Sequence, residues 1–239
     1  MTLLGDEDRA ILEERFSEEM EREVELLFFS RQDYHQQEIS EFPAEMEGAD
    51  QDVMAQACAI SYQLYREVVE LSPHLKLSFH DLDSPEGFQA AVELGLDPLM
   101  LPVMAFRAES LAGKSHFFGI PVGYEFTTLI ENIIDLSRNA NHLSPETQTA
   151  LVGLAQPARI RVFVTPTCSI CPSAVRMAHQ MAMSSPYVTA DIIEANEFQE
   201  LAEQFYVYGV PKMIVNEEVE FEGAVPEKVF LGKVLAAAN

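Results

Sequence analysis

The sequence is poor in cysteine, glycine and long apolar runs, and each shortage excludes a class of protein. Three cysteines in 239 residues are too few for a disulfide-stapled scaffold. No apolar run approaches the roughly 18 to 20 residues that a membrane-spanning helix needs. The 11 glycines form no G-x-G-x-x-G motif, so no flavin or nicotinamide fingerprint is present and we expect no cofactor.

Basic side chains are also scarce, with 15 Lys and Arg against 39 Asp and Glu and a net charge of −24. Without a basic patch, nucleic acid and anionic membrane surfaces are excluded as expected partners. The first 50 residues hold 16 acidic and 4 basic side chains, and so carry half of the net charge. A solvated acidic helix followed by a loop explains this excess, and adaptation to high salt is an alternative that composition alone does not decide.

The chain begins with MTLLGDEDRA, which has neither the basic flank nor the apolar core of an export signal. Hydrophobic residues make up 48% of the sequence, enough for a substantial core in one large or two ordinary domains. We therefore expect a soluble, cytoplasmic protein in a reducing compartment.

Two segments of the chain, residues 79–106 and 189–215, resemble each other. Each has an apolar strand that ends in acidic residues, a helix that opens near Phe-Gln, a hydrophobic residue followed by proline, and another strand. Each then continues into a further short strand, a glycine and a closing helix. Such self-similarity indicates an internal repeat of about a hundred residues.

Upstream of these segments, residues 23–30 and 158–165 have the pattern of buried strands, and a helical pattern follows each of them. Both halves therefore have the element order β-α-β-α-β-β-α, in which the first β-α-β is a parallel crossover. We predict an α/β protein of two domains, with residues 1–140 in the first and 141–239 in the second.

The chemistry of the chain is concentrated in TPTCSICPSA, residues 165–174, where two residues separate Cys168 from Cys171. A strand ends here and a helix is predicted to follow, which places Cys168 at a helix N-terminus, where free N–H groups and the helix dipole stabilise a thiolate. Cys171 falls in the first turn, close enough to attack a mixed disulfide on Cys168. We predict a redox dithiol in which one cysteine attacks and the other resolves.

A zinc site and a chemically inert pair are the alternatives to a redox dithiol. A structural zinc site uses four ligands, usually a second CxxC or a histidine pair at short spacing. The only other cysteine, Cys58, lies in an apolar helical run, and the six histidines form no such pair. We therefore expect no metal, and a buried core cysteine at position 58.

A second element of interest is Val210-Pro211, at the start of a predicted strand. A residue before proline favours an extended conformation, and a cis bond there would be a deliberate feature. In a fold with this element order, the turn lies against the cysteine pair, where the backbone of Val210 can pair with an extended substrate. Lys212 either favours the thiolate of Cys168 or is an exposed strand residue without a role.

The run Cys168–Pro172 after a strand, Pro211 after Val210, and the Gly223 turn before the last helix resemble the thioredoxin superfamily. With two such halves, the chain is most similar to the tandem-thioredoxin-fold protein disulfide oxidoreductases, also called glutaredoxin-like. It is also similar to the tandem N-terminal domain of the flavoprotein component of alkyl hydroperoxide reductase. The resemblance covers roughly residues 20–237 and is most specific in the second half.

This resemblance implies two tandem thioredoxin-like folds, each a central mixed sheet flanked by helices, and a thiol–disulfide oxidoreductase without cofactor. It implies that Cys168 and Cys171 are catalytic. The substrate-binding positions that we expect are Thr167, Ser169, Ile170, Val210 and Pro211. The expected partners are protein disulfides or dithiols, with a reductase or a small thiol as the source of electrons.

The first half departs from the thioredoxin pattern. No cysteine stands in residues 31–52, where a thioredoxin-type site belongs, although Leu101-Pro102 keeps the proline position. We expect this half to be redox-silent. In thioredoxin a buried aspartate precedes the first cysteine by six residues, whereas Val162 stands there in this chain. Proton transfer to Cys171 therefore needs water or a carboxylate that the sequence does not identify.

The sequence leaves the direction of exchange open, because nothing in Ser169-Ile170 sets the redox potential. Two other functions stay open beside a general oxidoreductase. The chain can be an electron relay dedicated to one peroxidase or reductase. It can also be a non-catalytic module that binds peptides along Leu101-Pro102 and Val210-Pro211.

Overall fold

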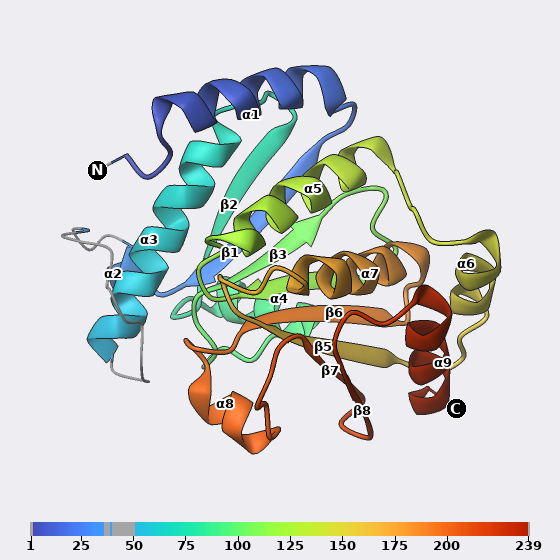
Figure 1. Ribbon diagram of the computed structural model, residues 1–239. Coiled ribbons are helices and arrows are strands. Elements are labelled where there is room, and N and C mark those ends of the chain that lie inside the picture. Colours follow the sequence, from blue (N-terminus) through green and yellow to red (C-terminus); the bar gives the residue numbers. More distant parts are fainter. Residues whose placement is uncertain (1, 36–38, 40–50, 239) are drawn as a thin grey trace.

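The computed structural model describes residues 2–35, 39 and 51–238, which fold around one eight-stranded sheet (Figure 1). The strands of the first half are β1 (Val24–Ser30), β2 (Leu75–Asp81), β3 (Val103–Arg107) and β4 (Lys114–Phe118). Those of the second half are β5 (Ala158–Val164), β6 (Val188–Glu194), β7 (Lys212–Val215) and β8 (Val219–Glu222). The helices are α1 (Asp6–Glu19), α2 (Gln32–His35), α3 (Gln51–Val69), α4 (Pro85–Leu94), α5 (Tyr124–Arg138), α6 (Pro145–Val152), α7 (Cys171–Ser184), α8 (Gln199–Gln204) and α9 (Glu227–Ala237).

The sheet has the strand order β2-β1-β3-β4-β6-β5-β7-β8. In each half one parallel pair, β1 with β2 or β5 with β6, is followed by antiparallel pairing to the last two strands. The parallel pair β4 and β6 joins the two halves. The predicted mixed sheets are thus confirmed, and the two four-stranded units are continuous with each other.

The predicted domain boundary at residues 140 and 141 falls between α5 and α6. Because strand pairing and the hydrophobic core continue from one half into the other, this boundary remains a prediction. Residues 36–38 and 40–50, part of the stretch that takes the place of a redox motif in the first half, lie outside the described residues.

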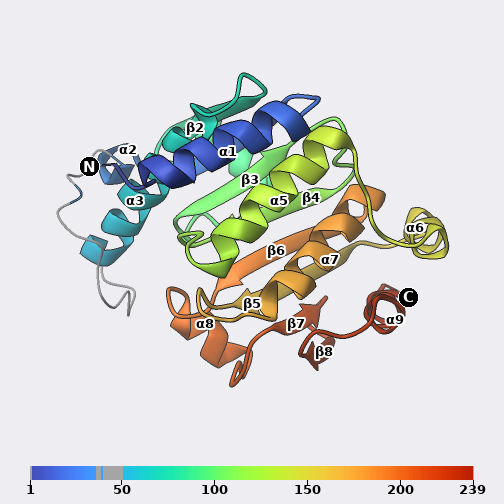
Figure 2. The ribbon, with the colours of Figure 1, turned by 45° about the horizontal axis from the view of Figure 1, so that its top comes forward.

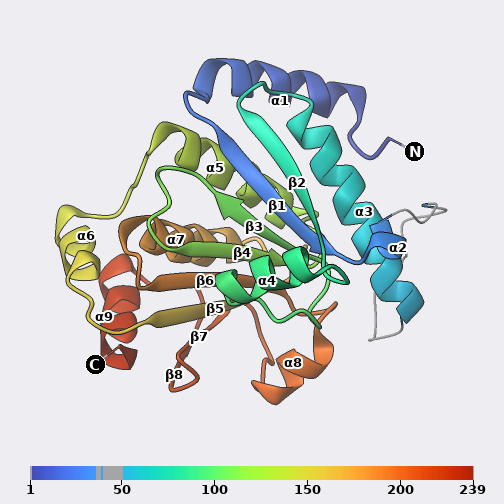
Figure 3. The ribbon, with the colours of Figure 1, turned by 180° about the vertical axis from the view of Figure 1, so that it is seen from behind.

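Helices cover the sheet on both faces. Helices α5 and α7 lie side by side across one face (Figures 1 and 2), and α4 lies on the opposite face (Figure 3). The acidic helix α1 packs along α5. No described helix is long and apolar enough to cross a membrane.

The central strands form because most of their side chains are apolar on both faces, with Glu25, Arg159 and Arg161 as half-buried exceptions. In β1 and β5 nearly every residue is buried, as expected for strands covered by helices on both sides. Helix α4 begins where Ser84 caps the N–H of Gly87 and Pro85 occupies the first turn, and it ends at Gly95 in the left-handed conformation. In α3, Cys58 is fully buried, which confirms the predicted core cysteine.

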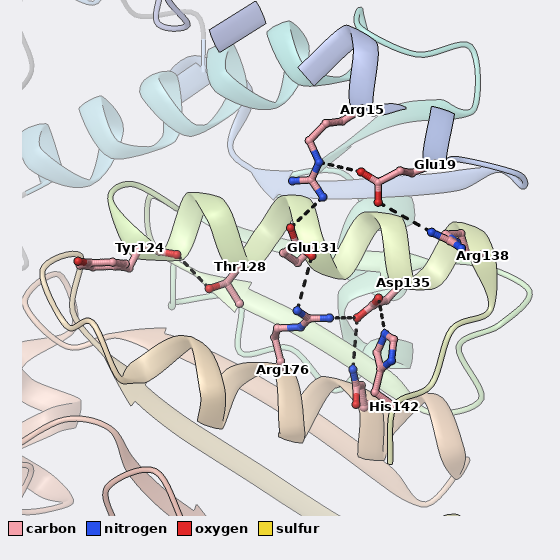
Figure 4. A network of polar contacts seen from close by, with 10 residues as sticks. Arg15, Glu19, Tyr124, Thr128, Glu131, Asp135, Arg138, His142 and Arg176 are labelled. Atoms are coloured by element: carbon pink, nitrogen blue, oxygen red, sulfur yellow. Dashed lines mark hydrogen bonds and ion pairs between the residues drawn. The ribbon is translucent and has the colours of Figure 1, made fainter. Parts of the chain in front are cut away.

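A polar network ties the two halves together between α5 and α7 (Figure 4). Arg176 of α7 makes ion pairs with Glu131 (3.5 Å) and Asp135 (2.7 Å) of α5. Glu131 also pairs with Arg15 of α1 at 2.9 Å, and His142 contacts Asp135 at 3.1 Å. The network holds α5 against α7, the helix that begins with Cys171, on the same face of the sheet.

Candidate active site

The candidate active site lies where β5 ends and α7 begins. Cys168 and Cys171 form a disulfide with an S–S distance of 2.20 Å and a Cα–Cα distance of 5.5 Å. The helix begins at Cys171, as the helical pattern of residues 171–184 predicted. Cys168 therefore precedes the helix, and the backbone N–H of Cys171 points at its sulfur at 3.1 Å. An N–H group of the helix N-terminus stabilises a thiolate on Cys168 in this position.

The two cysteines differ in exposure. Cys168 is half-buried, whereas Cys171 is completely buried at the start of α7. The predicted neighbours Thr167, Ser169 and Ile170 are all exposed beside Cys168. A partner can reach Cys168 from solvent, while Cys171 can react only with a group already bonded to Cys168.

The proline loop lies against this pair. The Sγ atom of Cys168 is 3.7 Å from the carbonyl oxygen of Val210. Both Val210-Pro211 and Leu101-Pro102 have cis peptide bonds. A cleft of about 300 Å³ runs along Val210, Tyr208 and Thr165 toward α8. The structure thus brings Val210 and Pro211 to the cysteine pair, and their role in binding substrate stays a prediction.

The expectation that Lys212 is an exposed strand residue was wrong. Its side chain is buried, and its Nζ atom donates to the carbonyl oxygens of Phe205 and Tyr206 and pairs with Glu220 at 2.8 Å. These bonds hold the segment before the proline loop. The ammonium group is therefore held by these three oxygen partners and is not free to act on the thiolate of Cys168.

Glu125 is a site residue that the sequence did not reveal. It stands at the start of α5 in the first half, yet the N–H of the preceding Tyr124 donates to the carbonyl of Pro166, in the loop that carries Cys168, at 3.0 Å. Gly123, with a φ of 60°, makes this approach possible, since a Cβ there would lie 2.3 Å from the Pro166 oxygen. Glu125 is therefore positioned directly behind the loop of the cysteine pair.

The carboxyl group of Glu125 is only 1% exposed, and neither of its oxygens has a hydrogen-bond partner among the described residues. Burial, with a smaller contribution from Glu194, raises the pKa of Glu125 to about 8. Glu125 and Val175 line the same small cavity, and Val175 lies one helical turn after Cys171 on α7. A carboxyl group in this state can hold or release a proton near neutral pH.

Two more carboxyl groups, those of the buried Glu194 and the half-buried Glu197, lie near the seam between the halves. Glu197 accepts the N–H of Ile120 at 2.7 Å, and Glu194 at the end of β6 accepts the N–H of Glu197 at 2.6 Å. Burial raises the pKa of Glu197 to about 8 and also raises the pKa of Glu194. Nothing in the local sequence marks these residues, because their burial comes from contacts with the other half.

Among the described residues of the first half, the one cysteine is Cys58. Cys58 is buried in α3, and burial raises its pKa to about 12. Among residues 2–35, 39 and 51–238, no group of three or more His, Cys, Asp and Glu side chains could hold a metal ion.

Residues 158–236, the part that carries the cysteine pair, match the family model for a thioredoxin domain. The F protein of alkyl hydroperoxide reductase from Pseudomonas putida is 28% identical over 118 residues, which cover 49% of this chain and 23% of that protein. The chain thus spans about a quarter of the length of this curated relative.

Solved structures match nearly the whole chain. A protein disulfide oxidoreductase from Aeropyrum pernix k1 superposes with a TM-score of 0.79 at 26% identity, covering 98% of this chain and 93% of that one. A mutant of the alkyl hydroperoxide reductase F protein from Enterococcus faecalis (V583) gives 0.76 at 19% identity, covering 97% and 99%. These similarities confirm the predicted resemblance and the tandem thioredoxin-like fold.

Proposed function

We propose that this thioredoxin-fold disulfide oxidoreductase transfers two electrons between its Cys168–Cys171 pair and the disulfide or dithiol of a partner protein. The proposal rests on the different solvent exposure of the two cysteines. Cys168 is half-buried against the Val210 carbonyl, and Cys171 is fully buried behind it. This is the arrangement that attack by one thiol and resolution by the other requires.

In the reducing direction, the Cys168 thiolate attacks one sulfur of the partner disulfide, which breaks the partner's S–S bond and releases its first thiolate. Cys171 then gives up its proton and attacks the Cys168 sulfur, releasing the second thiolate. The partner disulfide gains two electrons and two protons and leaves as two thiols, while the protein is oxidised to the Cys168–Cys171 disulfide. The same steps in reverse oxidise a dithiol.

Glu125 is our candidate for the group that exchanges the proton of Cys171. It lies behind the cysteine loop, and its raised pKa of about 8 leaves both protonation states accessible at neutral pH. The carboxylate form accepts the proton of Cys171 during reduction of a partner, and the acid form returns it to the leaving Cys171 thiolate in the reverse reaction. The first half thereby contributes to the reaction without a dithiol of its own.

We place the partner's extended segment along Val210 and Pro211, with Thr167, Ser169 and Ile170 contacting the residues next to its cysteine. The exposed side chains at Ile170 and Tyr208, 51% and 89% exposed, provide an apolar surface at this edge. An apolar peptide flanking a disulfide suits such a surface better than a highly charged one. We also propose a cytoplasmic location, because a reducing compartment keeps such a dithiol working as a switch.

A dedicated electron relay is the second candidate. The similarity to one segment of the alkyl hydroperoxide reductase F protein supports it, since that segment is part of a longer reductase in the relative. In this case a single reductase or peroxidase would be the preferred partner of Cys168, and exchange with unrelated disulfides would be slow.

The test is to trap the mixed disulfide. We expect Cys171→Ser to accumulate a covalent adduct between Cys168 and a cysteine-containing partner peptide, read by non-reducing mass spectrometry. Cys168→Ser should form no adduct, and Cys58→Ser is the matched control that should behave like the wild type. An adduct on Cys171, or equal adducts in both variants, would contradict the assigned order of attack. Comparing several unrelated peptides separates a general oxidoreductase from a dedicated relay.

A further inference from the structure

A small cavity in the interior of the protein lies between helices α5 and α7 and the strands beneath them. Its volume is about 10 Å³, which is room for one water molecule. Helix α5 contributes polar side chains to its wall from successive turns, and α7 contributes Val175. The complete lining is Phe106, His116, Phe117, Glu125, Thr128, Leu129, Asn132, Val175 and Ile192.

Three polar groups of one helix face line this cavity. Glu125 and Asn132 are 1% and 4% exposed, and neither the Glu125 oxygens nor the Asn132 Oδ1 atom has a hydrogen-bond partner among the described residues. Thr128 lies between them and donates its hydroxyl proton to the carbonyl of Tyr124 at 3.0 Å (Figure 4), which leaves its oxygen able to accept. Buried polar atoms of this kind are normally satisfied by protein or by ordered water.

We propose that this cavity binds one water molecule, which Asn132 holds against the carboxyl group of Glu125. When Glu125 is protonated, the water accepts its O–H and donates to Asn132 Oδ1 and Thr128 Oγ1. When Glu125 is a carboxylate, the water turns and donates one of its protons to the carboxylate instead. Asn132 is then a positioning residue, because it acts on the reaction only through the water and Glu125.

The water lowers the cost of ionising Glu125 in an otherwise apolar setting, since a hydrogen bond to the charged form favours that form. The other titratable groups that face Glu125 are Glu194 at the end of β6, whose charge opposes ionisation, and His116 of β4, which lines the same cavity. From α7 the titratable side chains on this face are Cys171, one turn before Val175, and the buried His179, one turn after it. His179 lies against the backbone of Asn132 and contacts the ring of Phe106 in the cavity wall. The inference deepens the role proposed above for Glu125 and rests on it for its functional meaning.

Two measurements on the oxidised protein test the water site directly, because Cys171 cannot titrate in a disulfide. The first is a high-resolution crystal structure, in which we expect a water within hydrogen-bonding distance, about 3 Å, of both Glu125 and Asn132. The second is a carbon-13 NMR titration of the Glu125 carboxyl, assigned with Glu125→Gln. An empty cavity in the crystal structure would overturn the proposal.

In the titration, we expect Val175→Ile to fill the cavity and Asn132→Leu to remove the acceptor, each raising the pKa of Glu125 by roughly 1. Val175→Ile keeps every polar group, so it tests the water even if Asn132→Leu fails to fold. Val175→Ala, which enlarges the cavity, is the matched control and should leave the pKa unchanged or lower it. An unchanged pKa in Val175→Ile would refute the proposal. These outcomes need no exchange activity, so they are distinct from a failure of the proposed function.

Discussion

The two halves of the molecule share an order of strands but differ in what each contributes at the seam between them. The second half carries Cys168 and Cys171 after β5, and the first half has no cysteine in the described residues between β1 and α3. The first half instead sends Glu125 to the back of the cysteine loop, while the second has Val162 at the position where thioredoxin has its buried acid. A repeat that has no dithiol can thus still place a titratable group behind the loop that carries Cys168, and its part in the reaction is the proposal made above.

The continuous sheet explains how this division is possible. Strands β4 and β6 pair in parallel, and the ends of both strands therefore meet at the same edge of the sheet. Helix α5 follows β4 and α7 follows β5, so the starts of both helices lie at this edge (Figure 2). Each half brings one helix N-terminus to a common site, with Glu125 on one and Cys171 on the other.

The largest contrast between the halves is expected in thiol reactivity. In the reduced protein, Cys168 should be alkylated at mildly acidic pH at least roughly 1000-fold faster than Cys58, because the Cys171 N–H stabilises its thiolate while burial raises the pKa of Cys58 to about 12. Timed alkylation with peptide mass spectrometry measures both rates in one sample. Equal labelling of all three cysteines, and only at alkaline pH, would remove the contrast.

The proposed contribution of the first half predicts the next effect. Glu125→Gln should slow single-turnover exchange with a peptide disulfide roughly 100-fold and should remove the pH dependence of that rate near 8, because the amide cannot take up the Cys171 proton. Stopped-flow kinetics across the pH range gives both quantities. Glu197→Gln is the matched control, since Glu197 also has a pKa of about 8 but does not line the cavity shared with Val175. A normal rate and profile in Glu125→Gln would leave the first half without a catalytic role.

Glu197 itself should govern stability more than rate. Its pKa is raised in the folded protein from the ordinary value of 4.5 to about 8, so its stabilising contribution is complete below pH 4.5 and is lost as the pH rises toward 8. Glu197→Gln, which keeps an oxygen for the Ile120 N–H, should therefore unfold like the wild type at pH 4.5. At pH 9 it should be more stable by several kcal/mol, with an upper bound of roughly 5 kcal/mol for a rise of the pKa from 4.5 to about 8. Urea denaturation at the two pH values tests this. Equal unfolding free energies for the variant and the wild type at both pH values would contradict it.

The smallest expected effect concerns the contact between the halves. Arg176→Met removes the ion pairs to Glu131 and to the buried Asp135 and should cost about 1 kcal/mol of unfolding free energy. Lys76→Met, which breaks an exposed pair with Glu23 inside the first half, is the control and should cost clearly less. Denaturant titrations of both variants give the comparison. If the two variants lose the same amount, the network in Figure 4 contributes no more than an ordinary surface pair.

Much of the architecture was accessible from local patterns. The predicted strands at residues 23–30 and 158–165 match β1 and β5 within one residue at each end. A short apolar run bounded by polar residues is typical of a buried strand, because it is too short for most helices. The placement of the cysteine pair between a strand and a helix followed from the same patterns. The start of α7 at Cys171 also agrees with the predicted helical pattern, in which Pro172 suits the first turn because it needs no N–H donor there.

The order of the elements, the repeat and the spacing of Cys168 and Cys171 can be read from local patterns, because they depend on residues close together in the chain. The burial of Lys212, and the place of Glu125 behind the cysteine loop with a pKa raised to about 8, follow from long-range packing. So does the joining of the two sheets through β4 and β6. The physical reason is that desolvation and proximity come from residues far apart in sequence, and a carboxyl group gives no local sign of what will cover it.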